Sequence, residues 1–256
     1  MIRPSVNQLY IYFRNCDDAL KIIKSGRMNC SKATSFNDPF DCAIPFIVDH
    51  DPAEIVAAWV RLGTQESRTW ESIRKHIDRD LNDDASLNDT AKTRINSEAA
   101  RYRSENEEMG IVCFTEDPAS VLMWSHYGGK HQGVVLGFER VDGNELGDDD
   151  ACYPITYTDE FPTPRFSEIL YADGQLTNKL MSTKAREWAY EKEWRAFYPK
   201  ANTEIDIPSP IKSIIVGCNA PSQLIDDCRA EASRQSIPLL QAEKVPGRFA
   251  LTIKPI

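Results

Sequence analysis

The 256-residue sequence lacks the features of membrane proteins and of the common nucleotide-binding folds. Its longest apolar runs, Gly133–Phe138 and Ile211–Val216, are far too short to cross a bilayer. There is no Walker-type loop and no GxGxxG loop, so the sequence signatures of P-loop and Rossmann proteins are excluded. Residues Met1–Pro4 begin no signal-peptide pattern, and we therefore expect a cytoplasmic protein that does not enter a membrane.

Metal-binding patterns and basic charge are also scarce. A site could be assembled from Cys113, His126 and His131, but there is no CxxC or HExxH spacing, so we expect no metal. The 7 cysteines are odd in number and scattered, which favours reduced, mostly buried thiols. A net charge of −9 argues against a broad basic surface that binds nucleic acid nonspecifically, although a local basic groove is compatible with it.

The pattern of apolar residues predicts an α+β fold with a largely β core and flanking helices. Helices are expected from an N-cap at Asp17 or Asp18 to a stop at Gly26, and over 118–127, 175–190 and 221–235. Strands are expected over 9–13, 28–34, 110–115, 133–139, 153–157, 193–198, 211–216, 239–245 and 251–256.

Residues 51–108 show no strand pattern. A helix beginning at Pro52 is followed by two polar amphipathic helices near 66–81 and 88–108. We therefore expect a single domain over residues 1–256 that is interrupted by a helical insertion at about 51–108.

Two carboxylates, Glu191 and Glu193, stand two residues apart at the start of a predicted strand. If the extended conformation begins at Glu191, both side chains point to one face. Such a pair suits chemistry at an anomeric carbon, where one carboxylate stabilises an oxocarbenium-like centre and the other handles a proton or positions the acceptor. The spacing alone favours a solvated charged turn, with Glu193 paired to Arg195 or Lys192.

Aromatic rings and glycines are concentrated in Trp124–Gly129, which is followed by His131 and Gly133. Aromatic faces stack on rings, and glycines let a backbone approach a ligand. The alternative is the end of a helix with a glycine stop, with Trp124 in the core and His126 and His131 on the surface.

The segment Ser35–Asp41 is rich in turn-forming residues. Its amide and carboxylate groups could face a ribose or a base. From the residues alone, Asx turns in which Asn37 and Asp41 bond their own backbone are the favoured interpretation.

Four motifs, in this order, resemble a bacterial family known only as a domain of unknown function. They are Leu9–Tyr12, Phe36–Asp41, Trp124–Tyr127 with His131–Gly133, and Trp188–Arg195. The resemblance covers about residues 10–200, and four motifs in one order make it specific. That family in turn resembles a branch of the ADP-ribosyltransferase superfamily, whose members cleave NAD at the nicotinamide ribose and transfer ADP-ribose to protein or nucleic acid.

This resemblance implies a split β core, mixed or antiparallel, that binds NAD between two small sheets. Glu193 is then the acid that bonds the ribose 2′-hydroxyl, and Glu191 orients the acceptor. The superfamily usually has His or Arg on its first strand, but that position falls near Ile11 here. The implied NAD-binding residues are Tyr10, Tyr12, Arg14, Asn37, Asp38, Thr115, Trp124, Ser125, His126, Tyr127 and His131.

The resemblance also implies an ADP-ribosyltransferase that modifies a macromolecule and acts as a toxin or anti-phage defence effector. RNA or DNA is the first expected acceptor and protein the second, and an antitoxin protein is a further expected partner. The alternatives are a non-catalytic sensor or partner-binding module, which would use the insertion for its contacts, and a glycohydrolase that acts on NAD or a nucleoside.

Overall fold

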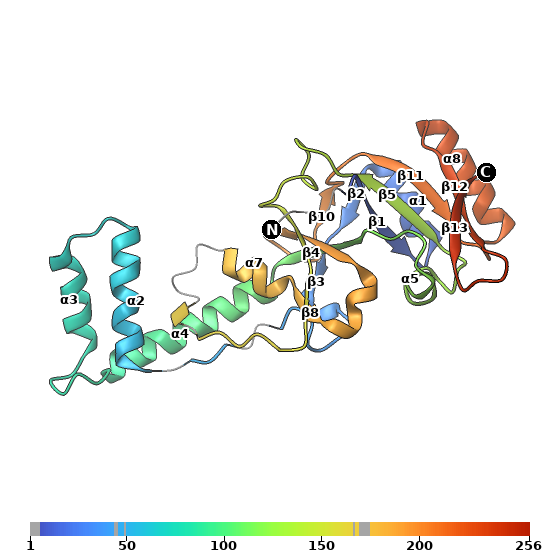
Figure 1. Cartoon of the computed structure of the whole chain (residues 1–256). Helices are drawn as coiled ribbons and strands as arrows, with labels where there is room; N and C mark the ends of the chain where they lie inside the picture. Colours follow the sequence, from blue (N-terminus) through green and yellow to red (C-terminus); the bar gives the residue numbers. More distant parts are fainter. Residues whose placement is uncertain (1–5, 44–45, 49, 166, 169–174) are drawn as a thin grey trace.

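The computed structural model describes residues 6–43, 46–48, 50–165, 167–168 and 175–256 (Figure 1). A β-sheet body carries helices on its faces, and a helical arm projects from one end of it (Figure 1). The predicted α+β class is confirmed, since a mixed sheet and flanking helices are both present. Membership of the ADP-ribosyltransferase fold stays a prediction.

The largest sheet is antiparallel except where β11 pairs with β12. Its strands lie side by side in the order β13 (Leu251–Pro255), β12 (Leu239–Lys244), β11 (Ile211–Val216), β5 (Val134–Glu139), β1 (Gln8–Phe13), β4 (Gly110–Thr115), β9 (Glu193–Tyr198) and β6 (Cys152–Pro154), and β3 (Ser31–Lys32) also pairs with β4. Two small sheets pair β2 (Arg27–Asn29) with β10 (Glu204–Asp206) and β7 (Thr156–Thr158) with β8 (Thr183–Ala185).

The large sheet divides between β1 and β4. Strand β1 pairs with β5 along its whole length, but its register with β4 consists of Tyr10 opposite Thr115 alone. Strand β4 pairs along its whole length with β9 on its other side. Because strands twist relative to their neighbours, strands that stop pairing diverge. Two half-sheets therefore share one residue pair and leave space between them.

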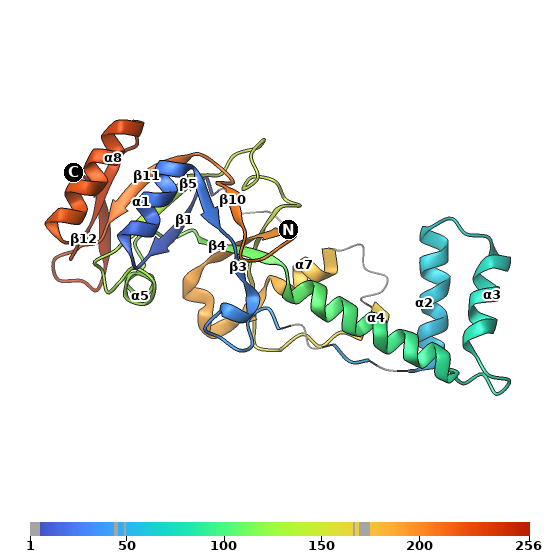
Figure 2. The same ribbon diagram turned by 180° about the vertical axis from the view of Figure 1, so that it is seen from behind.

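Hydrophobic clusters cover both faces of the half-sheet that contains β5. On one face, α1 (Cys16–Ser25) and α8 (Ser222–Gln235) pack over the main core (Figure 2). On the other face, Trp124 of α5 (Val121–His126) packs with Val135 and Ile215. Adjacent residues of one strand point to opposite faces, so β5 is buried on both.

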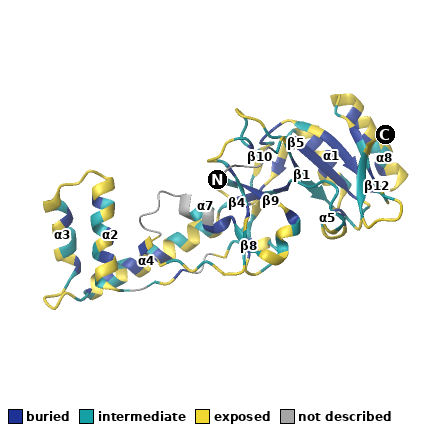
Figure 3. Ribbon diagram, viewed as in Figure 1, coloured by how far each residue is buried: buried dark blue, intermediate teal, exposed yellow. Residues whose placement is uncertain are grey.

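The arm consists of α2 (Pro52–Gln65), α3 (Trp70–Asp80) and α4 (Asp89–Glu107), which confirms the helices predicted for residues 51–108. Buried residues of α2 and α4, together with Phe46 and Leu87, form a separate hydrophobic cluster that contains Ile55, Ala91, Ile95 and Ala99. Much of the surface of the arm helices is exposed (Figure 3). No helix in the described part of the chain combines the length and the apolar character needed to cross a membrane.

Several predicted boundaries are wrong. The helix predicted over 175–190 is α7 (Gln175–Met181), then β8, then the 3-10 helix η2 (Arg186–Glu191). Pairing of β8 with β7 overrides the local helix preference. The strand predicted over 153–157 is β6 and β7, which belong to different sheets.

At the N-terminal end of the chain, two further details differ. The strand predicted over 28–34 is β2, β3 and the 3-10 helix η1 (Ala33–Ser35). The N-cap of α1 is Asn15, whose side chain accepts a hydrogen bond from the Asp17 amide, and not Asp17 or Asp18. Gly26 ends α1 as predicted, in the left-handed conformation.

All seven cysteines are free thiols, as predicted. Three of them are buried (Cys30, Cys152 and Cys228) and four are partly buried, so burial is less complete than predicted.

Candidate functional site

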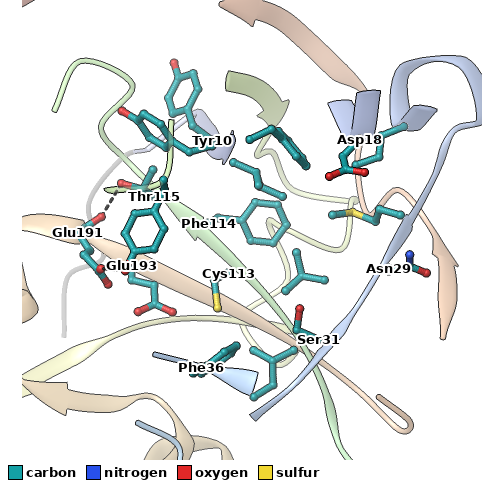
Figure 4. Close-up of a pocket in the computed structure, with 18 of the residues that line it drawn as sticks. Tyr10, Asp18, Asn29, Ser31, Phe36, Cys113, Phe114, Thr115, Glu191 and Glu193 are labelled. Carbon is teal, nitrogen blue, oxygen red and sulfur yellow. Dashed lines mark hydrogen bonds between the residues drawn. The ribbon is translucent and has the colours of Figure 1, made fainter. Parts of the chain in front are cut away.

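A cavity of about 500 Å³ lies at the split between the half-sheets (Figure 4). Residues 10–13 of β1 and residues 111–115 of β4 line it, and Glu191 and Glu193 lie in its wall. Cavities of this size hold small-molecule ligands in other proteins. The divergence of two strands thus creates space beside the predicted pair of acids.

Five charged side chains form a buried cluster, and four of them, Asp41, Lys184, Glu191 and Glu193, line the cavity, while Arg195 lies behind them. Lys184 Nζ lies 2.6 Å from Glu191 Oε2, 2.8 Å from Glu193 Oε2 and 3.1 Å from the Asp41 carboxylate. The Arg195 guanidinium lies 2.6 Å from Glu193 Oε1 and 2.7 Å from the Asp41 carboxylate. With all five side chains ionised, three carboxylates and two cations leave one negative charge in a site where every member is at most 7% exposed.

The two glutamates meet through a turn and not through an extended strand. Glu191 is the last residue of η2, and β9 begins at Glu193. Lys192 between them adopts a left-handed conformation with φ of 45°. The prediction that the strand begins at Glu191 is therefore wrong, although the predicted convergence of the two carboxylates is found at Lys184.

Hydrogen bonds fix the backbone on both sides of this turn. The Thr115 hydroxyl donates to the Glu191 carbonyl at 2.5 Å, and the Glu193 amide donates to the Tyr157 hydroxyl at 2.8 Å. The end of β4 thus holds the backbone of Glu191, and strand β7 holds the backbone of Glu193.

The electrostatic surroundings of the two acids differ. Burial would raise the pKa of Glu193, but the charges of Arg195 and Lys184 outweigh it and lower that pKa from 4.5 to about 2. Burial raises the pKa of Glu191, and the single cation Lys184 compensates only in part. Glu193 is therefore a fixed anion, whereas Glu191 is the acid of the pair that exchanges a proton more readily.

Tyr127 completes the surroundings of Glu191. Its hydroxyl donates to Glu191 Oε1 at 2.7 Å. Burial, and then the Glu191 charge, raise the pKa of Tyr127, so the phenol stays neutral and remains a donor. Asn37 Nδ2 lies 3.5 Å from the same hydroxyl.

The structure brings together about half of the residues predicted to bind NAD. Those that line the cavity are Tyr10, Tyr12, Asn37, Thr115 and Tyr127. Those that do not line it are Arg14, Asp38, Trp124, Ser125, His126 and His131.

Trp124 has a structural environment. It is completely buried, its indole nitrogen donates to the Pro118 carbonyl at 2.9 Å, and the His131 ring stacks beside it. Ser125 Oγ lies 3.0 Å from His131 Nε2, which ties the chain after α5 back to the helix. These contacts match the alternative interpretation of this motif as the end of a helix with Trp124 in the core.

The glycines of the same motif serve chain packing. A Cβ atom on Gly133 would lie 2.0 Å from the Phe13 carbonyl oxygen. Gly133 therefore lets the start of β5 approach the end of β1 closely.

The two carboxylates of the turn-rich segment Ser35–Asp41 have different positions, because Asp41 lines the cavity and Asp38 does not. Asp38 forms an Asx turn by accepting from the Phe40 amide at 2.9 Å, and it also accepts from the Trp188 indole at 2.7 Å. Asp41 was predicted to bond its own backbone, but its carboxylate lies in the charged cluster with Lys184.

Sequence reasoning missed the cations of the site. The sequence predicts Arg195 as a solvated partner of Glu193 or as part of a local basic track, but its side chain is completely buried. Lys184 was hidden because its segment was predicted to be helical, and Tyr157 gave no signal. Among the described residues, no group of histidine, cysteine, aspartate and glutamate side chains is arranged to hold a metal ion.

Comparison with known proteins gives one family. A family model described as "Protein of unknown function (DUF2971)" matches residues 123–196, which agrees with the predicted resemblance to a family of unknown function. The matched segment includes Tyr127, Lys184, Glu191, Glu193 and Arg195. No curated protein and no solved structure matches the chain.

Proposed function

We propose that the chain is an ADP-ribosyltransferase that cleaves NAD between nicotinamide and ribose and transfers ADP-ribose to a macromolecule. The buried pair Glu191 and Glu193, in a cavity wall with an excess of one negative charge, carries this proposal. The nicotinamide ring of NAD is cationic, and positive charge moves to the ribose as the glycosidic bond breaks. A preorganised anion in a site shielded from water stabilises that charge more than water does.

The proposed roles follow the different surroundings of the two acids. Glu193, held by Arg195 and Lys184, supplies constant negative charge. Glu191 contacts the ribose and accepts the proton that the attacking group of the acceptor loses, which suits an acid with a raised pKa. The bonding electrons leave with nicotinamide, which departs neutral and needs no proton.

The remaining cavity residues suit the rest of such a ligand. Tyr10 and Tyr12 of β1 present phenol rings, and Asn37 presents an amide at the same wall as Tyr127. Rings pack against the flat faces of a nicotinamide or a base, and the amide bonds polar edges.

Resemblance supports the biological part of the proposal. It favours RNA or DNA as the acceptor before protein, a role as a cytoplasmic toxin or defence effector, and an antitoxin protein as a partner. A glycohydrolase would use the same acids with water as the acceptor, and a non-catalytic module would use the arm.

Turnover of etheno-NAD, which becomes more fluorescent when nicotinamide leaves, tests the proposal. We expect the wild-type chain to cleave it and Glu191→Gln to lose at least about 100-fold in rate, in the range for loss of a general base. Glu187→Gln is the matched control, because Glu187 is an exposed acid in the same 3-10 helix.

Two results would contradict the proposal. The first is the absence of NAD binding in calorimetry, and the second is equal cleavage by wild type and Glu191→Gln. If labelled NAD is cleaved without transfer of label to RNA, DNA or protein, the glycohydrolase replaces the transferase.

A further inference from the structure

Four aromatic side chains form a continuous row beside the charged cluster. The C-terminal end of α5 supplies His126 and its C-cap residue Tyr127, with ring centroids 6.3 Å apart. From η2 come Tyr190, 6.3 Å from His126, and Trp188, 6.0 Å from Tyr190. We call these four residues the aromatic row. Two sequence motifs that are far apart in the chain therefore build one surface.

Both ends of the aromatic row contact the charged cluster. At one end, the Tyr127 hydroxyl bonds Glu191 at 2.7 Å. At the other end, Lys184 Nζ lies 5.2 Å from the centre of the Trp188 ring, within the range of a cation–π contact. In the middle of the row His126 is exposed, and Tyr190 is partly exposed, as are Tyr127 and Trp188 at the two ends. A molecule on the row is thus beside Glu191.

The two middle members of the row, His126 and Tyr190, have polar groups that could bond a ligand. Within the described ranges, no hydrogen bond links the His126 ring nitrogens or the Tyr190 hydroxyl to another residue. A surface with ring faces and free polar edges matches a planar heterocycle that also has donors and acceptors on its edge. A nucleobase has both, whereas the side chains of phenylalanine, tyrosine and tryptophan have at most one polar group each.

The exposed cations near the row are not arranged to bind a series of phosphate groups along a nucleic-acid backbone. Arg186, at the start of η2, lies 2.8 Å from Asp159, and Lys192, after its end, lies 3.2 Å from Asp117. Each of these exposed cations already faces a carboxylate. Phosphate contacts depend on cations that can release counterions. Binding at this surface must therefore depend on the bases.

We infer that the aromatic row binds an unpaired nucleobase of single-stranded nucleic acid by stacking, next to Glu191. The role of the aromatic row in binding the acceptor rests on the proposed transferase function. Its ability to bind single-stranded nucleic acid does not depend on that function. A paired base keeps its faces within the duplex, so the site selects single strands. Stacking on aromatic rings tolerates different bases.

Fluorescence anisotropy with short labelled single-stranded RNA and DNA tests the inference. We expect the full chain to bind single strands in preference to the same sequence in a duplex. Tyr190→Ala and His126→Ala should each weaken binding by about 5- to 100-fold, as expected for lost stacking. The control is Trp70→Ala, because Trp70 is an aromatic residue 62% exposed on the arm.

The dependence on salt adds a second readout. A protein that relies on many phosphate contacts loses roughly 1,000-fold or more in affinity between about 50 and 200 mM salt, whereas stacking on this row predicts a loss below about tenfold. Absence of single-strand binding, equal affinity for duplex, a steep salt dependence, or equal affinities of wild type and both row variants would overturn the inference. Preference for a peptide rich in aromatic residues would also overturn it.

Failure here is distinguishable from failure of the proposed function. Binding of single strands that requires Tyr190, without cleavage of NAD, supports the aromatic row and contradicts the transferase. Cleavage of NAD and labelling of protein, without binding of single strands, contradicts the aromatic row and leaves the transferase.

Discussion

At the scale of single residues, the two acids of the cavity have different tasks. Glu193 is bonded by Arg195 and by Lys184, whereas Glu191 has Lys184 and the Tyr127 hydroxyl. Removal of one charge from a well-paired buried cluster leaves the others uncompensated. The two conservative variants should therefore separate stability from turnover.

We expect Glu193→Gln to lower the free energy of unfolding by roughly 3–5 kcal/mol, the cost of breaking a buried ion pair. Glu191→Gln should change stability by less than about 1 kcal/mol, because the burial that raises its pKa already disfavours its charge. Urea denaturation at neutral pH measures both values. A larger loss for Glu191→Gln than for Glu193→Gln would show that the roles are reversed.

Sequence reasoning at this scale found anions more readily than cations. The pair Glu191 and Glu193 stood out because two acids at this spacing have a known use. Lys184 did not, because only the pairing of β8 with β7 brings it to the acids. Trp124 had two interpretations, because an indole suits a ligand pocket and a core equally well, and the structure places it in the core.

At the scale of elements, the decisive feature is the turn between η2 and β9. Lys192 has φ of 45°, which costs a residue with a Cβ about 1–2 kcal/mol relative to the right-handed region. This conformation breaks the extended backbone just before β9 begins at Glu193. As a result, the Glu191 side chain contacts Lys184. The geometry of one residue thus sets the distance between the two acids.

Substitutions at Lys192 test this role. Lys192→Gly should keep both stability and NAD cleavage near wild type, because glycine adopts positive φ freely and the exposed pair with Asp117 contributes little. Lys192→Val should lower stability by about 1–2 kcal/mol and also reduce cleavage, since a β-branched residue resists this conformation. Thermal unfolding and etheno-NAD turnover would be measured together. If Lys192→Val had the stability and the etheno-NAD turnover of wild type, the conformation of Lys192 would not determine the position of the two acids.

The sequence predicted most elements whose apolar pattern is regular. Strands β1, β4, β5, β9 and β11 and the three arm helices lie close to their predicted ranges. The failures are short elements such as β10, where Glu204–Asp206 is mostly polar and is a strand only because it pairs with β2. Long-range pairing partners leave no local signal, and for that reason the residues alone did not predict that β1 pairs with β4 at one position only.

At the scale of the whole molecule, the charged cluster links folding to pH. The pKa of Glu193 is lowered from 4.5 to about 2, so its stabilising contribution is complete above about pH 4.5 and is lost as the pH falls through 2. The pKa of Glu191 is raised, so its contribution has the opposite sign, being present below 4.5 and lost as the pH rises through its folded-state value.

Unfolding free energies measured as a function of pH would show both effects. The advantage of wild type over Glu193→Gln should shrink by roughly 3 kcal/mol between pH 4.5 and pH 2, because folding lowers the pKa of Glu193 from 4.5 to about 2. Between pH 4.5 and neutral pH, Glu191→Gln should gain stability relative to wild type. If the unfolding free energies of all three proteins changed with pH in the same way, the opposite pKa shifts of Glu191 and Glu193 would be wrong.

The single residue pair between β1 and β4 has a consequence for amide hydrogen exchange. Strand β1 lies in the middle of the large sheet, yet beyond Tyr10 its side toward β4 pairs with no strand residue in the described chain. Amide hydrogens of residues 11–13 that do not bond to β5 should therefore exchange as fast as those of an edge strand, and far faster than those of β5. A bound ligand that slows them would act as the missing neighbour and make the sheet continuous across its centre.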